Sequence, residues 1–329
     1  MRSGPPPIAP LRWRGLVITV SAVAVGGLIL GLALRDSSSV GHFTSTAAKD
    51  RFLAAYNKAM EDLPPPDNVL DLHTSFGIVR LYRFNGDATQ QVPILLLPGR
   101  SSASPVWADN VPSLWHQGPV YTIDLLGEPG MSVQDRPITS AADQAQWLHE
   151  VLTQLPEPQL DVLGVSIGGW TGMNLAVRQP AKIRAVMLLD PVFVFHPMSI
   201  EAMIRSIPAS VRWLPKAWRD SFNSWTANGV PVKDVPIAQM IEAGMQSYAL
   251  KLPAPQRINQ QQLIRLDRPV LVILAGQSPM HDSQAAAAVA RRTLRSGKVI
   301  VYPEASHAIN GEYPDQIAAD IKAFRAELA

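Results

Sequence analysis

Short runs of apolar residues alternate along the chain with longer segments whose apolar residues recur every three or four positions. The runs predict buried strands and the periodic segments predict helices. Strands are expected at 78–84, 92–97, 120–124, 160–165, 185–189, 270–275 and 298–302, and helices at 141–155, 171–178, 284–294 and 314–328. Such alternation is typical of a mostly parallel central sheet flanked by helices, with the strand at 78–84 antiparallel in an early hairpin.

The alternation is interrupted between about residues 192 and 262. This segment contains several tryptophans and methionines, is punctuated by prolines, and carries no strong strand signal. We therefore expect a helical insertion between two strands, forming a cap or lid over one end of the sheet. Its aromatic and methionine side chains would suit an apolar ligand, although any one of them more often packs an insertion onto its body.

A long apolar segment precedes this pattern. Residues 16–34 carry no charge and are long enough to cross a bilayer as one helix. Arg12 and Arg14 stand before the segment, whereas the charges of Arg35 and Asp36 cancel after it, so the amino terminus is expected in the cytoplasm and the body outside. The alternatives are a cleaved signal peptide, which would release a secreted body, and a buried core helix. The length of the segment and the lack of an Ala-x-Ala site favour the anchor over the signal peptide.

The chain is thus expected to consist of successive parts. These are a cytoplasmic stub at 1–15, a transmembrane anchor at 16–34, a linker with an amphipathic helix at 35–66, and an α/β domain at 67–329 that contains the insertion. Three consecutive prolines at 64–66 end the amphipathic helix.

Composition narrows the classes of function. Hydrophobic residues make up 47% and charged residues 17%, which describes a globular chain with a substantial core. The absence of cysteine excludes disulfides, thiolate metal sites and a cysteine nucleophile. The net charge is +2, and no basic cluster marks the body, so no nucleic-acid partner is expected. No metal or organic cofactor is expected, because no His/Asp/Glu spacing resembles a ligand set.

The most specific chemical signal is a Gly-x-Ser-x-Gly motif after the strand expected at 160–165. Between strand and helix, this motif describes a nucleophile elbow, a turn so tight that the positions two before and two after the serine have no room for side chains. Gly164 and Gly168 meet that need around Ser166. The serine hydroxyl would project above the sheet edge, beside a helix amino end that favours negative charge. A plain tight turn is the alternative.

A series of motifs in a fixed order resembles the α/β-hydrolase superfamily, in particular its serine esterases and lipases with a helical lid. The motifs are Pro98-Gly99-Arg100-Ser101-Ser102 after a strand, the turn Asp124…Gly127…Gly130-Met131-Ser132, the elbow Gly164-Val165-Ser166-Ile167-Gly168, and the late Ser306-His307. The resemblance covers about residues 75–329. It implies an α/β-hydrolase fold and hydrolysis through an acyl-enzyme.

The resemblance also implies roles for individual residues. Ser166 would be the nucleophile and His307 the base that takes its proton. The backbone amides of Ile167 and Arg100 would form the oxyanion hole. The family commonly has His-Gly-x in this loop, where this chain has Pro98, but the donors are backbone atoms, so the change does not by itself endanger catalysis.

The acid of the expected triad is less well defined. The family usually has Gly-x-x-Asp after the strand that corresponds to 270–275, whereas this chain has Gly-Gln-Ser-Pro there. Asp282 is the only carboxylate in that loop and is the expected acid. Asp190, at a position used by some lipase-like relatives, is the alternative, although it could instead cap a turn before proline. The remaining alternatives are that Glu304 is the acid or that the site has no acid.

These inferences predict a membrane-anchored serine hydrolase that cleaves a small-molecule ester, with an apolar acyl group. The superfamily also contains amidases, thioesterases, acyltransferases, C–C bond hydrolases and perhydrolases, and the fold does not choose among them. A non-catalytic binding module that keeps the elbow as scaffold is a third hypothesis, favoured by the irregular acid loop.

Overall fold

The computed structural model describes residues 37–85, 91–212 and 214–328 of the chain. The residues from Ser39 onward form one compact unit. The stub and the anchor predicted at 16–34 lie outside the described residues. Within the residues that are described, no helix is both long and apolar enough to cross a membrane.

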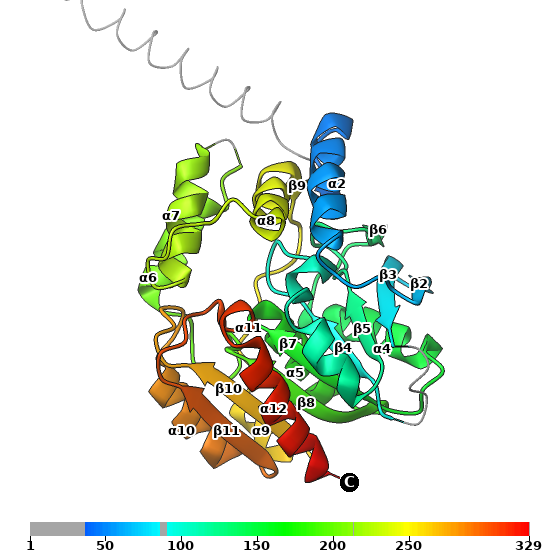
Figure 1. Ribbon diagram of the computed structural model, residues 1–329, viewed down its shortest axis with the longest axis vertical. Helices are drawn as coiled ribbons and strands as arrows, with labels where there is room; N and C mark the ends of the chain where they lie inside the picture. The colour runs from blue at the N-terminus through cyan, green and yellow to red at the C-terminus, as the bar shows by residue number, and fades with distance from the viewer. Residues whose placement is uncertain (1–36, 86–90, 213, 329) are drawn as a thin grey trace, which may run out of the picture. The chain divides into compact units, whose positions relative to one another are not determined.

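A mixed sheet forms the centre of the compact unit (Figure 1). Its strands are β2 (Asn68–Thr74), β3 (Gly77–Phe84), β4 (Ile94–Leu97), β5 (Val120–Ile123), β6 (Val133–Gln134), β7 (Leu160–Val165), β8 (Ile183–Leu189), β10 (Val270–Ala275) and β11 (Gly297–Tyr302). Their order is β11-β10-β8-β7-β4-β5-β3-β2, with β6 paired to β3. The pairs from β11 through to β5 are parallel, and β3 is antiparallel to β2, β5 and β6. The mostly parallel sheet and the early hairpin strand are therefore confirmed.

Helices cover both faces of this sheet. They are α2 (Thr46–Met60), α3 (Val111–Leu114), α4 (Ala141–Gln154), α5 (Ile167–Arg178), α9 (Gln260–Arg265), α10 (Ser283–Thr293), α11 (Ile309–Glu312) and α12 (Pro314–Ala326). Successive side chains of a strand point to opposite faces, and those of β4 divide accordingly. Leu95 and Leu97 join a buried cluster with α4, α5 and α10, whereas Ile94 and Leu96 join one with α2, α3 and α12.

The helix expected within the linker at 35–66 belongs to the compact unit as α2. Its Tyr56 is buried, and the phenol donates a hydrogen bond to the carboxylate of Asp124 at 2.9 Å. The same carboxylate accepts bonds from the Ser104 hydroxyl and the Met131 amide. Because Asp124 opens the glycine-rich turn after β5, α2 is fixed to a loop at the carboxyl end of the sheet.

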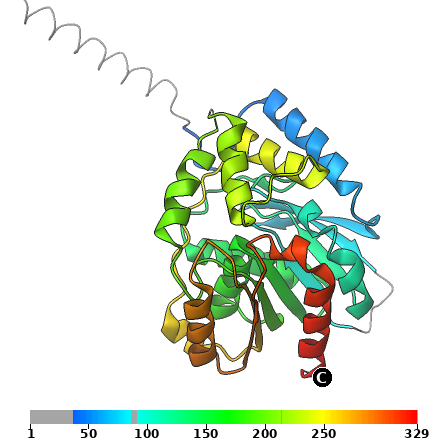
Figure 2. The same cartoon turned by 60° about the vertical axis from the view of Figure 1, so that its left-hand side comes forward.

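The segment expected as an insertion forms three helices, a two-residue strand and α9. The helices are α6 (Ile200–Ala209), α7 (Lys216–Thr226) and α8 (Pro236–Ser247), and the strand is β9 (Tyr248–Ala249). Figures 1 and 2 show α6, α7 and α8 grouped on one side of the sheet, with α8 beside α2. The buried Arg219 on α7 contacts Glu242 on α8 at 2.7 Å, and β9 pairs with β1 (His42–Phe43).

The strand order creates a crevice at one point of the sheet. From β4 the chain passes to β5 on one side, and it later returns to β7 on the other side. The loops that leave β4 and β7 therefore separate, and open α/β sheets bind their ligands at such a point. Leu97 at the end of β4 pairs with Gly164 near the end of β7. The topology thus brings the loop beginning at Pro98 beside the turn that holds Ser166.

Candidate active site

Ser166 lies on the sharp turn between β7 and α5. Its φ of 55° and ψ of −118° form a combination that non-glycine residues rarely adopt. A Cβ on Gly164 would lie 2.3 Å from the carbonyl oxygen of Gly168, and a Cβ on Gly168 would lie 2.2 Å from that of Leu97. The steric reason for the motif is therefore visible in the structure. Helix α5 begins directly after the serine, earlier than the expected residue 171.

The loop after β4 lies against this turn. A Cβ on Gly99 would come 3.7 Å from the Cβ of Ser166, so the two loops are in van der Waals contact. The amide of Ile167 stands at the open amino end of α5. Neither this amide nor that of Arg100 has a hydrogen-bond acceptor among the described residues. Both are available to the oxygen of a ligand bound at Ser166.

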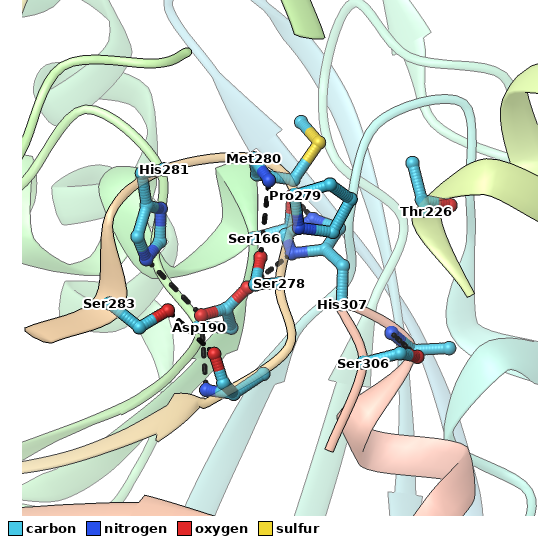
Figure 3. Close-up of polar contacts among 12 residues, drawn as sticks. Ser166, Asp190, Thr226, Ser278, Pro279, Met280, His281, Ser283, Ser306 and His307 are labelled. Atoms are coloured by element: carbon cyan, nitrogen blue, oxygen red, sulfur yellow. Dashed lines mark hydrogen bonds and ion pairs between the residues drawn. The ribbon is translucent and has the colours of Figure 1, made fainter. Parts of the chain in front are cut away.

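His307, from the loop after β11, reaches Ser166 from the other end of the chain (Figure 3). Its Nε2 lies 2.8 Å from the Ser166 Oγ, and its Nδ1 lies 2.5 Å from the Oδ2 of Asp190. Asp190 follows β8, which is the neighbour of β7 in the sheet. Serine, imidazole and carboxylate thus form a continuous series of contacts.

The structure places Asp282 elsewhere. It precedes α10, and its carboxylate accepts a hydrogen bond from the amide of Ala285 at 2.9 Å, as a helix N-cap does. Glu304 is exposed. Of the three carboxylates considered from the sequence, Asp190 is the one in contact with His307. The expectation that Asp282 holds this position is not supported by the geometry, because its side chain is turned to the helix.

Asp190 is completely buried, and its surroundings favour the ionised form. Burial alone would raise the pKa of Asp190, but its contacts with His281 and His307 outweigh burial and lower that pKa below its ordinary value. Its Oδ1 also accepts a hydrogen bond from the Ala275 amide at 3.2 Å. The carboxylate is therefore available to orient an imidazole and to stabilise its protonated form.

Comparisons with known proteins identify the family of the chain. A model of the alpha/beta hydrolase family matches residues 94–320, which is well over half of the chain. This chain belongs to the α/β-hydrolase family. The expected fold is confirmed by that match.

Relatives of this α/β hydrolase include proteins named as esterases. An uncharacterized carboxylesterase, nap, of Bacillus subtilis (strain 168) is 21% identical over 281 residues, which cover 83% of this chain and 92% of that protein. The crystal structure of carboxylesterase CesB from Bacillus subtilis shares the fold with a TM-score of 0.77 at 19% identity, covering 85% of this chain and 98% of the other. The structure of a membrane phospholipase A, described as a bacterial virulence factor, has a TM-score of 0.68 at 16% identity, and the match covers 96% of this chain and 98% of the other.

Two side chains of the site were not identified from the sequence. The first is Glu128, which is buried and bonds both to the Arg100 guanidinium at 2.7 Å and to the Ser101 amide at 3.0 Å. Burial raises the pKa of Glu128, while Arg100 and the Ser101 amide partly oppose this effect. The residue thereby fixes the loop that carries the Arg100 amide. The feature of the sequence that points to Glu128 is its position in the glycine-rich turn after β5.

The second is His281, in the loop after β10 where the acid was expected. Its ring is 1% exposed, and its Nε2 lies 3.3 Å from the Oδ1 of Asp190 (Figure 3). Asp190 therefore stands between two histidines. The sequence contains a signal for this residue, since a histidine directly precedes Asp282 in the loop where the family usually has its acid.

The loop that carries His307 is held on both sides. The Ser306 amide and hydroxyl both donate to the carboxylate of Glu312, at 2.8 and 2.5 Å. The amide of His307 itself donates to the carbonyl of Thr226 at the end of α7, at 3.1 Å. The insertion therefore touches the loop of the histidine directly.

A narrow pocket adjoins the loops that carry the two free amides. Its lining is mainly apolar and comes from Arg100, Leu125, Leu126, Glu128, Gln144, Trp147, Ile167, Trp170, Thr171, Leu252, Pro253 and Pro255. Ile167, which directly follows Ser166 in the chain, and Arg100 are part of this lining. The insertion contributes Leu252, Pro253 and Pro255.

The close approach at Gly168 generates a stability prediction. A methyl group at this position meets the carbonyl oxygen of Leu97, a backbone atom that cannot turn aside. Gly168→Ala is therefore expected to destabilise the fold by about 3 kcal/mol or more, because overpacking forces the two loops apart. Thermal and denaturant unfolding of the variant and the parent protein measure this change.

Gly172→Ala, one turn later on α5, is the matched control. Its Cβ would meet side-chain atoms of Val162 and Leu97 at 3.0 and 3.3 Å, and alanine favours the helix by about 1 kcal/mol. A change within about 1 kcal/mol is expected there. Equal stabilities of the two variants would contradict the steric account of the elbow.

Proposed function

We propose that this α/β hydrolase is a serine hydrolase that cleaves carboxylic esters through an acyl-enzyme on Ser166. The observation that carries the proposal is the series of contacts from the Ser166 hydroxyl through His307 to the buried carboxylate of Asp190. Relatives named as carboxylesterases support the ester as the bond that is cleaved.

In the first half-reaction, the Ser166 Oγ attacks the ester carbonyl while His307 Nε2 takes its proton. The negative charge that develops on the carbonyl oxygen is stabilised by the amides of Ile167 and Arg100. When the tetrahedral intermediate collapses, the C–O bond to the alcohol breaks, and the imidazolium returns the proton to the leaving oxygen. Asp190 holds the ring so that Nε2 faces the serine, and it stabilises the positive charge.

In the second half-reaction, water replaces the alcohol. His307 takes a proton from water as it attacks the acyl-enzyme, and the Ser166 oxygen then leaves with that proton. If an alcohol took the place of water, the same steps would transfer the acyl group. Product analysis with water alone and with added alcohol therefore distinguishes hydrolysis from acyl transfer.

Removing each residue of the contact series is expected to have a different effect from removing Asp282. Ser166→Ala should abolish both ester hydrolysis and covalent labelling by a fluorophosphonate. Asp190→Asn should lower kcat by about 10³- to 10⁴-fold, because the amide cannot stabilise the protonated imidazole. Steady-state kinetics on a soluble ester and the rate of labelling measure these effects.

Asp282→Asn is the matched control for Asp190→Asn. Because asparagine also caps helices well, kcat is expected to remain within a few-fold of the parent value. A collapse of turnover in Asp282→Asn with an active Asp190→Asn would overturn the assignment of the acid. A folded parent protein that is not labelled at all would favour a binding module.

The substrate is proposed to carry an apolar acyl group. Trp147, Trp170 and Leu252 belong to the mainly apolar lining beside the loops of Arg100 and Ile167. The cavity between them is only about 10 Å³, so the segment at 252–255 has to move aside before a hydrocarbon chain enters. The insertion is proposed to act as the lid over this substrate. Its contact with the His307 amide through Thr226 and its share of the pocket support that role.

We therefore expect kcat/KM to rise with acyl length from acetate to octanoate, by up to about 15-fold for each added pair of methylene groups that becomes fully buried. Leu252→Ser should weaken this preference, because the side chain lines the pocket. Leu250→Ser, at a position that is 39% exposed, should leave it unchanged. A kcat/KM that is flat or falls beyond acetate would exclude an apolar acyl pocket.

The body is proposed to be held outside the cytoplasm by a single membrane-spanning segment at 16–34. The support is the uncharged segment itself and the arginines that precede it. On α6 of the insertion, Ile200, Ile204 and Ile207 have exposed fractions of 72, 62 and 63%. Exposed apolar side chains of this kind suit a body that works near lipid.

The full-length protein should therefore remain in the membrane pellet after alkaline extraction, and protease added outside the cell should digest its body. Val25→Arg should reduce the membrane fraction, because a charge in the middle of the segment opposes insertion. Digestion of the body from the cytoplasmic side would contradict the orientation. A shortened protein in the external medium would indicate a cleaved signal peptide.

A further inference from the structure

The carboxylate of Asp190 has two oxygens with different partners. Oδ2 contacts His307 at 2.5 Å, which is the contact that the proposed mechanism uses. Oδ1 accepts the Ala275 amide at 3.2 Å and faces the Nε2 of His281 at 3.3 Å. The mechanism assigns no task to His281. In the part of the chain that the structure describes, neither ring nitrogen of His281 makes a hydrogen bond, so its Nε2 meets Oδ1 only as a close charge contact.

His281 is held in place by contacts around its own loop. Ser199, the residue before α6, donates its amide to the carbonyl of Met280 at 2.7 Å and its hydroxyl to the carbonyl of Pro279 at 2.8 Å. On the other side of the histidine, the Ser283 hydroxyl donates to the carbonyl of Ala275 at 2.6 Å. The buried ring is therefore fixed against Asp190 by both the insertion and the end of β10.

We propose that His281 is a positioning residue, which holds the free oxygen of Asp190 and limits how strongly the carboxylate draws a proton onto His307. The proposal rests on the proposed function of Ser166 and His307. It differs from that function because His281 touches neither the serine nor the crevice, and acts only through Asp190.

The direction of the effect follows from electrostatics. Whether His281 donates a proton to Oδ1 as a neutral ring or faces it as an imidazolium, it draws negative charge toward that oxygen. When this partner is removed, more of the charge stabilises the protonated form of His307. Because His307 acts as a base only when it is unprotonated, the variant should need a higher pH to reach the same fraction of its full activity. The acid limb of the activity profile should therefore move to higher pH.

Other charged groups around the pair are occupied elsewhere. Asp282 turns its carboxylate to the Ala285 amide, and Glu312 bonds to Ser306 on the loop of His307. On the segment after β8, the ring of His196 contacts the carbonyl of Pro197 at the surface. On α6, Glu201 pairs with Arg205 in solvent. None of these groups contacts Asp190.

The test compares the pH dependence of wild type with His281→Leu, His281→Phe and His281→Gln. Leu and Phe remove the polar ring atoms, and Phe keeps a ring of similar size, whereas Gln places an amide donor at a comparable reach. His149→Gln, on the distant helix α4, is the control for loss of a histidine. For each protein, kcat and KM on a soluble ester and the rate of fluorophosphonate labelling are measured from pH 5 to 9, with thermal unfolding as a check of folding.

In His281→Leu and His281→Phe, the acid limb of kcat/KM and of labelling is expected to move up by about one pH unit. At the pH optimum, kcat should fall about tenfold with KM unchanged, because Asp190 is held less firmly. His281→Gln should lie close to wild type, and His149→Gln should match it.

An acid limb at the wild-type pH in whichever of His281→Leu and His281→Phe is folded would overturn the inference, whatever the change in stability. If neither His281→Leu nor His281→Phe folds, His281→Gln decides. An acid limb of His281→Gln that moves up by about one pH unit would overturn the inference, whereas an acid limb at the wild-type pH would support it. A wild type that is neither labelled nor active would instead overturn the proposed function, and with it the inference.

Discussion

The site depends on a close approach between two pieces of backbone, the turn after β7 and the end of β4. A Cβ on Gly168 would lie only 2.2 Å from the carbonyl oxygen of Leu97, and a Cβ on Gly164 would lie only 2.3 Å from the carbonyl oxygen of Gly168. Without side chains at these positions, α5 can begin directly after Ser166 and press against the neighbouring loop. The loops that carry the amides of Ile167 and Arg100, the proposed oxyanion donors, then lie beside the serine. A looser turn would keep the fold and separate these donors from the nucleophile.

The strand order explains how residues far apart in sequence meet at this turn. β8 is the direct neighbour of β7, and β10 and β11 follow outward, so the loops after all four strands open on one edge of the sheet. Asp190 leaves β8 with a φ of 41°, a backbone conformation that turns the chain sharply at the strand end. His307 comes from β11, two strands farther out, and reaches the serine across Asp190. The carboxylate is thus covered completely and needs the polar partners that the structure supplies.

Much of this arrangement could be predicted from the sequence. The strands with solid apolar runs and the elbow follow from local patterns that leave few alternatives, and the late histidine follows from its place in the order of motifs that resembles the family. The acid could not be chosen in this way, because both Asp190 and Asp282 follow strands and the direction of a side chain in a loop depends on tertiary contacts. The two-residue pair of β1 and β9 has no local pattern either. The place of α2 in the compact unit depends on tertiary contacts, among them its buried apolar face and the bond from Tyr56 to Asp124, which spans 68 positions.

The choice of acid and the identity of residue 281 are connected. If the carboxylate that contacts His307 came from the loop after β10, as is usual in the family, the end of β8 would need no charged residue. With Asp190 as the carboxylate, the loop after β10 covers an existing charge, and an apolar residue at that place would leave Oδ1 with the Ala275 amide alone. A histidine fills the space and presents a polar atom to the carboxylate. The proline-containing turn at 276–279 and His281 thus cover the carboxylate of Asp190, and the irregular sequence of this loop is compatible with the proposed catalysis.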